Sequence, residues 1–333
     1  MSVPPDPLRD DAEPDDSALR EHAQYWVARL VAKDISASEL DTLEAWIAAD
    51  ARHARAFSCE RALWQDLGAV ADALPAPAPT RPIIRTMPIA ITRRRLMHAA
   101  PAALAASLAL AFFGPSLMID LRADHRTATG EVRSIALPDG TTAMLDSGSA
   151  ISVAFDGDRR TVHLLAGRAW FDVHHEGRPF MVEALDGETR DIGTGFEVRR
   201  DGGAVEVGVT NGMVQVRAPG RSDGPTLRAG ERVRYTADGM ATLPAEPATQ
   251  LAMWRRGELS IEQQPVRSAI AEIARYRSAP VWMIGDFSAS EPVSGLFLIQ
   301  RPDEALETIV KMRGLRTLRL PGGALIVRPN SAT

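Results

Sequence analysis

Few residues of this chain have the types and spacing that catalysis or metal binding requires. The one histidine cluster is His174-His175, which follows Asp172 closely. Adjacent residues of a strand point to opposite faces, so these two rings cannot readily share one metal ion. Asp172 and His174 could share a face, but we interpret the histidines as a surface pair and expect no metal site.

The other polar motifs also lack a catalytic context. Gly193-Thr-Gly195 has neither the lysine nor the strand–loop–helix setting of a phosphate-binding loop, so we expect a tight bend. Ser147 and Ser149 have no obvious base near them in the sequence. The single cysteine, Cys59, excludes an intrachain disulfide and a thiol cluster for zinc or iron–sulfur. The sequence therefore predicts a protein that is not an enzyme and uses no cofactor.

Composition describes ordinary folded material. The chain has 333 residues, of which 45% are hydrophobic and 24% are charged, which suggests two or three domains. The net charge of −5 provides no broad basic field, so we expect no direct nucleic-acid binding.

The N-terminal region has helical periodicity. Residues 1–16 are an acidic, proline-containing tail, and residues 17–74 repeat apolar side chains at steps of three and four. Ser36 and Glu39 have the spacing of a capping box, which opens a second helix. We predict a small bundle of three helices. Either its aromatic residues form the core, or some of them face a groove that another protein fills; these residues are Trp26, Trp46, Phe57 and Trp64.

A long apolar run lies one third of the way along the chain. A proline- and arginine-rich linker, residues 75–95, ends in Arg93-Arg94-Arg95 and is followed by apolar residues 96–119. A helix of that length reaches roughly 36 Å and can cross a bilayer core of roughly 30 Å. The arginines place the N-terminal side in the cytoplasm and resemble a twin-arginine export signal. The alternative interpretation is a buried, alanine-rich core helix.

Beyond the apolar run, residues 127–245 change to short alternating strands. The strands recur every ~8–12 residues and are separated by glycine turns, of which Gly167 is one. This spacing predicts an all-β sandwich, barrel or solenoid.

The pattern of the last region, residues 254–330, indicates two β-α-β halves, with helices near residues 265–274 and 303–313. A small sheet leaves open edges that can accept a partner strand. Leu296, Phe297 and Leu298 are three apolar neighbours in one strand, so at least one of them faces away from the helices.

An ordered series of blocks in the β region resembles the FecR family of transmembrane regulators. Upstream, Trp26, Trp46 and His53-x-x-Ala56-Phe57 are similar to the cytoplasmic anti-sigma domain of that family. The blocks are Leu137-Pro-Asp-Gly-Thr141, Leu145-Asp-Ser-Gly-Ser149, Arg160-Thr-Val-His-Leu164, Gly167-Arg-Ala-Trp-Phe-Asp-Val173, Arg178-Pro-Phe-Met-Val182, Asp191-Ile-Gly-Thr-Gly-Phe-Glu-Val198, Gly212-Met-Val-Gln-Val216, Leu227-Arg-Ala-Gly-Glu231 and Trp254-x-x-Gly257-x-Leu259.

The resemblance implies a multidomain fold. A small all-α cytoplasmic anti-sigma bundle (17–74) and a linker (75–95) precede one transmembrane helix (96–119). A periplasmic all-β, solenoid-like FecR lobe (127–245) follows. The C-terminal α+β lobe (254–330) is similar to the short N-terminal domain of secretins and TonB-dependent receptors. The implied location is the inner membrane, with a single pass and the C-terminus in the periplasm.

The resemblance also implies partners. The bundle would hold an extracytoplasmic-function sigma factor, with contact candidates Trp26, Trp46, Phe57 and Trp64. The C-terminal lobe would contact the N-terminal signalling domain of a TonB-dependent receptor, often one for iron–siderophores, with candidates Leu296, Phe297 and Leu298. An intramembrane protease would cut in or near the spanning helix. The alternative is a membrane-anchored ligand- or wall-binding module without a sigma partner.

Overall fold

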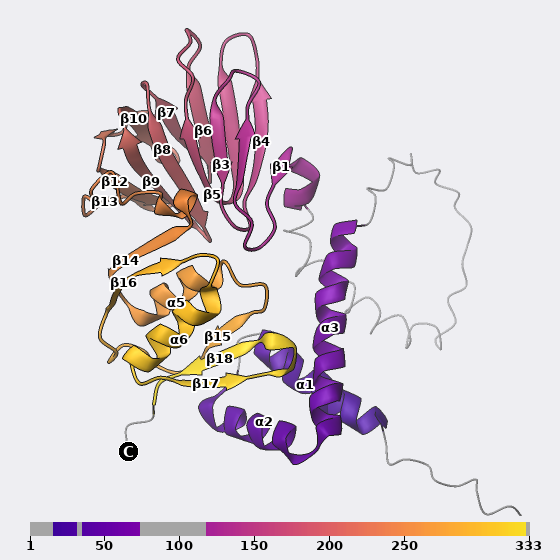
Figure 1. The fold of residues 1–333 in the computed structure, drawn as a ribbon. Coiled ribbons are helices and arrows are strands. Elements are labelled where there is room, and N and C mark those ends of the chain that lie inside the picture. The colour runs from indigo at the N-terminus through magenta and orange to yellow at the C-terminus, as the bar shows by residue number, and fades with distance from the viewer. Residues whose placement is uncertain (1–15, 32–34, 74–117, 331–333) are drawn as a thin grey trace, which may run out of the picture.

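The computed structural model describes residues 16–31, 35–73 and 118–330. Three parts follow one another along the chain: a helical bundle, a lobe of β-strands and a small α+β unit at the C-terminal end (Figure 1). The α+β unit, hereafter the C-terminal unit, lies between the other two parts and touches both.

The bundle consists of α1 (Asp16–Val31), α2 (Ala37–Ala49) and α3 (Ala51–Ala73). The predicted capping box is confirmed at the start of α2. The Ser36 hydroxyl accepts the Glu39 N–H, and the Glu39 carboxylate accepts the Ser36 N–H at 2.8 Å. This exchange satisfies amide groups that the first helical turn leaves without partners.

The β lobe is one mixed sheet of 13 strands. Both halves of the sheet bend around a core rich in valine, leucine and phenylalanine, in which the ring centroid of Phe171 lies 5.7 Å from that of Phe180 and 5.5 Å from that of Phe196. The strands are β1 (His125–Arg126), β2 (Arg133–Ala136), β3 (Thr142–Leu145), β4 (Ala150–Phe155), β5 (Arg160–Asp172), β6 (Phe180–Ala184), β7 (Gly187–Asp191), β8 (Gly195–Asp201), β9 (Ala204–Asn211), β10 (Met213–Arg217), β11 (Thr226–Arg228), β12 (Arg232–Thr236) and β13 (Gly239–Leu243).

Strand β5 belongs to both halves of the sheet. Residues 160–166 pair with β4 and, in parallel, with β6, whereas residues 167–172 pair with β3 and β8. Gly167 lies at the change of partners with φ +78°, a backbone conformation that favours glycine. The sequence predicted a turn here between two strands, and the structure shows instead one continuous strand that changes partners.

The C-terminal unit has two small sheets and two helices. Its β14 (Glu258–Gln264) pairs with β16 (Val293–Leu298), and β18 (Leu325–Arg328) pairs with β15 (Val281–Met283) and β17 (Arg316–Arg319). Helices α5 (Val266–Ala274) and α6 (Pro302–Met312) pack together over an apolar core. Two short 3₁₀ helices, η1 (Met253–Arg256) and η2 (Pro321–Gly323), complete the unit. The predicted order of two β-α-β halves is thus present, with two sheets in place of one.

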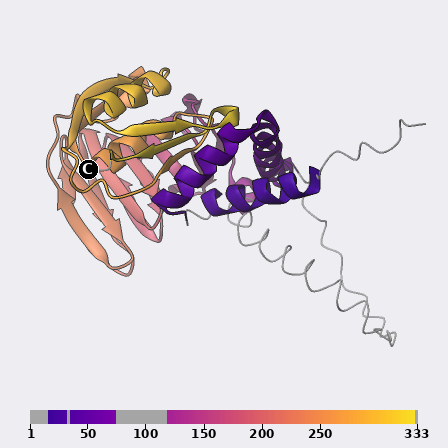
Figure 2. The same ribbon diagram turned by 90° about the horizontal axis from the view of Figure 1, so that it is seen from below.

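The bundle packs against the three-stranded sheet of the C-terminal unit. Figure 2 shows the indigo helices beside the yellow strands β17 and β18. Trp26, Leu30 and Phe57 share one apolar cluster with Leu320 and Ile326. At the edge of this contact, Arg328 forms ion pairs with Asp41 and Glu44, and the Arg61 guanidinium donates to the Gly322 carbonyl.

The predicted fold class is wrong for the β lobe. The lobe is not a solenoid, because β5 joins both halves of a single mixed sheet that curves into a half-barrel. No helix in the described ranges combines the length and apolar character needed to cross a membrane. The segment predicted to do so, residues 96–119, lies outside the described residues except for 118–119, which begin a short helical turn.

Candidate functional site

The sigma-contact candidates are divided between two environments. Trp26 is 8% exposed and Phe57 is fully buried, both in the cluster that joins the bundle to the C-terminal unit. Trp46 is half-buried, and its indole stacks on His53 with ring centroids 4.5 Å apart. Trp64 falls among the α3 residues whose side chains are not described. Only Trp46 of these candidates thus presents part of its side chain to solvent in the described structure.

The receptor-contact candidates lie on β16, whose only partner among the described strands is β14. Leu296 is 60% exposed and Leu298 is 49% exposed, whereas Phe297 is buried in the core of the C-terminal unit. Alternation along the strand explains this pattern, because successive side chains point to opposite faces. The free edge of β16 therefore carries two exposed leucines. The third group of candidates, Arg93, Arg94 and Arg95, lies outside the described residues.

The histidine pair occupies an exposed position after β5. Asp172, His174 and His175 are all exposed, and the His174 N–H donates to the Thr141 hydroxyl. Within residues 16–31, 35–73 and 118–330, no group of three or more His, Cys, Asp or Glu residues has a geometry that could hold a metal ion.

Two blocks of the sequence meet in a buried ion pair. Arg160 on β5 donates to the Asp139 carboxylate at 2.6 Å, and both side chains are almost completely buried. Burial favours the neutral carboxyl, but hydrogen bonds from Thr141 and the Arg160 charge outweigh it and lower the pKa of Asp139. The sequence predicted only a turn at Asp139, and its partner lies 21 residues away. This pair fastens the β2–β3 turn to the body of the lobe.

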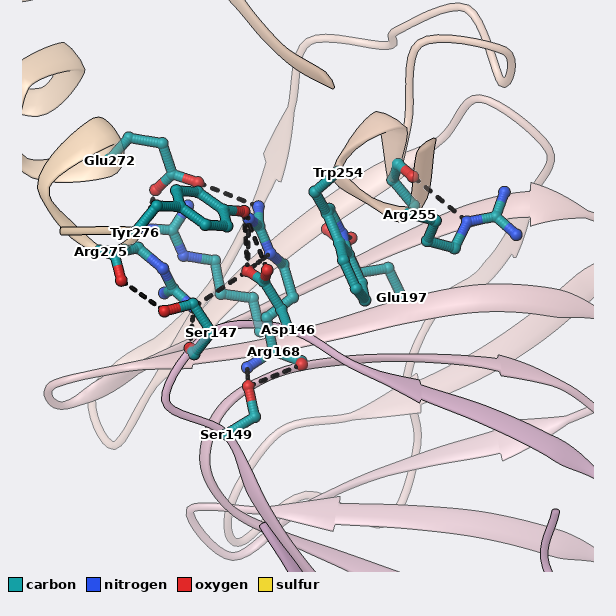
Figure 3. A network of polar contacts seen from close by, with 12 residues as sticks. Asp146, Ser147, Ser149, Arg168, Glu197, Trp254, Arg255, Glu272, Arg275 and Tyr276 are labelled. Carbon is teal, nitrogen blue, oxygen red and sulfur yellow. Dashed lines mark hydrogen bonds and ion pairs between the residues drawn. The ribbon is translucent and has the colours of Figure 1, made fainter. Parts of the chain in front are cut away.

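A second polar cluster joins the β lobe to the C-terminal unit (Figure 3). Arg168, on β5, lies 2.6 Å from the Asp146 carboxylate, and its Nη2 donates to the Tyr276 hydroxyl at 2.7 Å. The Tyr276 hydroxyl in turn donates to Asp146 at 2.9 Å. All three side chains are buried. Asp146 and Arg168 belong to the lobe, whereas Tyr276 follows α5, so this triangle spans the junction.

Glu272 extends the cluster along α5. Its carboxylate oxygens lie 3.0 Å from Arg168 Nη1 and 2.7 Å from Arg199 Nη2. Burial alone would raise the pKa of Glu272, but the charges of Arg168, Arg199 and Arg275 outweigh it and lower the pKa to about 2. Glu272 therefore stays ionised at neutral pH in a buried position.

The end of α5 rests on the turn between β3 and β4. The Ser147 hydroxyl donates to the Arg275 carbonyl and accepts the Gly130 N–H at 2.8 Å. Arg275 Nη2 reaches back to the Ser147 carbonyl at 3.3 Å. Because the last carbonyls of a helix lack intrahelical partners, Ser147 supplies a cap to α5 from the other part of the molecule.

Tryptophans line the same junction. Trp254 in η1 donates its indole N–H to the Glu197 carboxylate, and the Arg255 guanidinium lies 3.7 Å from the centroid of the Trp170 ring. Burial raises the pKa of Glu197, although the nearby charge of Arg168 opposes this. The junction is thus built mainly from charged and aromatic side chains.

Sequence reasoning missed this junction. The block Leu145–Ser149 contributes to the sequence prediction only through its resemblance to a family pattern, and no role is predicted for Glu272 or Tyr276. One signal was present: a glutamate, an arginine and a tyrosine stand within five positions on and after a predicted amphipathic helix. Their partners lie more than 100 residues away, and local periodicity cannot identify such pairs.

Comparison with known proteins identifies the family pattern to which the sequence blocks of the β lobe belong. Residues 123–215 match the FecR protein family, and residues 21–63 match a domain of unknown function, DUF4880. Residues 123–215 therefore form a FecR domain, as the sequence blocks predicted. The match spans Asp139, Asp146, Arg160 and Arg168, so the residues that the lobe contributes to the two buried clusters lie within the FecR domain. No curated protein matches the sequence.

Solved structures share much of this fold. Two crystal structures of a candidate anti-sigma factor from Parabacteroides distasonis align with TM-scores of 0.56 and 0.55. Both are 23% identical to this chain, and the alignments cover 62% of this chain and 99% and 98% of the others. At this identity the likeness establishes the fold alone.

Proposed function

We propose that this protein is a non-enzymatic regulator that binds an extracytoplasmic-function sigma factor through its helical bundle. The observation that carries the proposal is the FecR match, joined to a separate N-terminal match over α1–α3. The fold shared with a candidate anti-sigma factor supports it. A small helical domain precedes a lobe whose described residues have no features of a catalytic site. This arrangement suits a regulator that acts by binding.

The bundle offers a specific mode of regulation. Trp26 and Phe57 are buried in the apolar cluster that the bundle shares with the C-terminal unit, while Tyr25 is 50% exposed and Trp46 is half-buried. Exposed aromatic side chains contribute strongly to protein interfaces. We therefore assign the first contact with the sigma factor to Tyr25 and Trp46, and contact through Trp26 requires the bundle to leave the C-terminal sheet.

We further propose that the C-terminal unit receives the signal through a partner protein. The free edge of β16, with Leu296 and Leu298 exposed, suits addition of a strand from a partner such as the signalling domain of a TonB-dependent receptor. Leu296→Ser with Leu298→Ser should leave the fold intact, because neither side chain is buried, and should weaken binding of that domain about tenfold or more. Thr308→Ala, on the exposed face of α6, is the matched control.

A reporter experiment tests the regulatory role. The gene is deleted in the source organism, and transcription from promoters of each extracytoplasmic-function sigma factor is measured. The proposal expects the output of one sigma factor to change and the full chain to restore it. Unchanged output from every such promoter would refute it. Trp46→Ala, compared with Leu121→Ala at an exposed site outside the bundle, then tests whether the bundle carries the effect.

A further inference from the structure

Six residues form the polar cluster that fastens the C-terminal unit to the β lobe, and we call them the clasp. Three belong to the lobe and three to α5 and the residues directly after it (Figure 3). Apart from contacts among these six residues, the two parts are joined by residues 244–252, by the ion pair of Arg199 with Glu272, by the contacts of Trp170 and Trp254 and by a few apolar contacts. The clasp residues are Asp146, Ser147, Arg168, Glu272, Arg275 and Tyr276.

The clasp differs in character from the cores on either side of it. The lobe and the C-terminal unit each have a continuous apolar core of buried residues. Across the junction, by contrast, the lobe packs against the core of the C-terminal unit through side chains that are only partly buried, namely Val132, Met144 and Trp170. The clasp contacts involve ionised or hydroxyl groups. Interfaces between parts of one chain that rest on polar contacts permit relative motion more readily than large apolar interfaces do.

The clasp is also incompletely satisfied. Glu272 lies within ion-pair distance of Arg168 and Arg199, yet neither of its buried oxygens has a well-directed hydrogen bond. Cavities border Glu272 on two sides: one is also lined by Glu197 and Trp254, and the other by Pro265 and Ser268. The two oxygens of Glu272 are thus held by the attraction of opposite charges and not by directed hydrogen bonds, which fixes the position of α5 on the lobe less tightly than a fully hydrogen-bonded network would.

The clasp lies between the exposed edge and the lobe. Strand β16, whose edge is free, pairs with β14, and β14 leads through Pro265 into α5. The end of α5 is capped by Ser147 of the lobe. A strand added to β16 therefore acts on the sheet from which α5 starts, and α5 with the residues directly after it carries three of the six clasp residues.

We propose that the clasp is a releasable coupling: its opening lets the C-terminal unit move relative to the β lobe and changes the output of the regulator. The second half of this statement rests on the proposed function, and the first half does not. Motion at the junction is measurable without any partner, so the two halves can fail separately.

The test uses the full chain with Tyr276→Phe, which removes the contacts of the hydroxyl with Arg168 and Asp146, and with Glu272→Gln, which removes the charge that faces Arg168 and Arg199. Both substitutions leave Arg168 bound to Asp146. Hydrogen–deuterium exchange of α5 and of residues 146–149 should rise about tenfold or more, since each variant loses buried polar contacts that involve charged groups. Exchange within β10 and β11, which carry none of these residues, should not change. Tyr235→Phe is the matched control, since its hydroxyl donates to the Ala184 carbonyl inside the lobe, away from the clasp.

The possible outcomes test the motion at the junction and its regulatory role separately. Unchanged exchange of α5 in both variants would overturn the coupling itself. Faster exchange with sigma-dependent transcription identical to wild type would overturn the regulatory role of the clasp. Faster exchange together with altered transcription, absent in Tyr235→Phe, is the expected result. If the chain binds no sigma factor, the proposed function fails, and the exchange measurement still decides whether the junction opens.

Discussion

Arg168 holds two buried carboxylates at once, Asp146 of the lobe and Glu272 of α5. Its side chain is buried, and the nearby acids raise the pKa of its guanidinium despite that burial. Such a residue is costly to remove, because both acids would then be buried with fewer partners.

Replacement of Arg168 by methionine should therefore destabilise the protein by about 3–5 kcal/mol, as expected for breaking a buried ion pair from one side. Urea unfolding of the full chain measures the change. Arg221→Met is the control, because Arg221 is 64% exposed and lies 3.9 Å from its acid partner; its effect should stay within about 0.5 kcal/mol. Equal stability of the two variants would contradict the role given to Arg168.

Glu272 makes stability depend on pH. Its pKa in the folded protein is about 2, below the ordinary value of 4.5. A depressed pKa means that the stabilisation is complete above pH 4.5 and is lost as the pH falls toward 2, by roughly 3 kcal/mol in all. Glu272→Gln should be less stable than wild type at pH 7 and close to it near pH 2. A difference that stays constant across this range would contradict the assignment.

At the scale of elements, β5 decides the shape of the lobe. It exchanges its partners at Gly167, where a Cβ atom would lie 2.6 Å from Ser149 Cα and 2.8 Å from the Gly148 carbonyl. Both contacts are closer than real Cβ atoms approach backbone, so the two halves of the sheet meet at a point that only glycine fits.

Gly167→Ala should cost at least about 2 kcal/mol, from the positive φ and from the backbone clash together. Thermal unfolding of the full chain is the measurement. Gly157→Ala is the control, because its added Cβ meets nothing within 4 Å, and no loss is expected. A Gly167→Ala variant with wild-type stability would show that the strand can change partners without the glycine.

Elements were more predictable from the sequence than their pairing. Alternation and glycine spacing located most strands of the lobe, and periodicity located α5 and α6 close to their observed bounds. The partner exchange of β5 was not predictable, because both halves of that strand look alike locally. The clasp was missed for the same reason: Arg168 and Tyr276 are 108 positions apart, and no local pattern relates them.

At the scale of the whole molecule, the bundle contacts the C-terminal unit, and such a contact requires both parts to lie on the same side of any membrane. The location predicted from the sequence places them on opposite sides. The two arrangements exclude each other at any one moment, and Cys59, which is exposed and is the one cysteine of the chain, can distinguish them.

Labelling of intact cells with a membrane-impermeant maleimide, after permeabilisation of the outer membrane alone, makes the distinction. The predicted location expects Cys59 to react only after lysis. In a Cys59→Ser protein, a cysteine placed at the exposed Met312 should react before lysis. Equal labelling of Cys59 and of the cysteine at position 312 would instead match the contact between the bundle and the C-terminal unit, which lie side by side in Figure 2.

The proposed regulation of a sigma factor is tested most directly by binding. The purified full chain is mixed in turn with each extracytoplasmic-function sigma factor of the source organism and with the housekeeping sigma factor, and complexes are isolated by size-exclusion chromatography. We expect a stable complex with one extracytoplasmic-function sigma factor and none with the housekeeping factor. Trp46→Ala should weaken the complex that forms. A folded chain that binds none of them would contradict the proposed regulation.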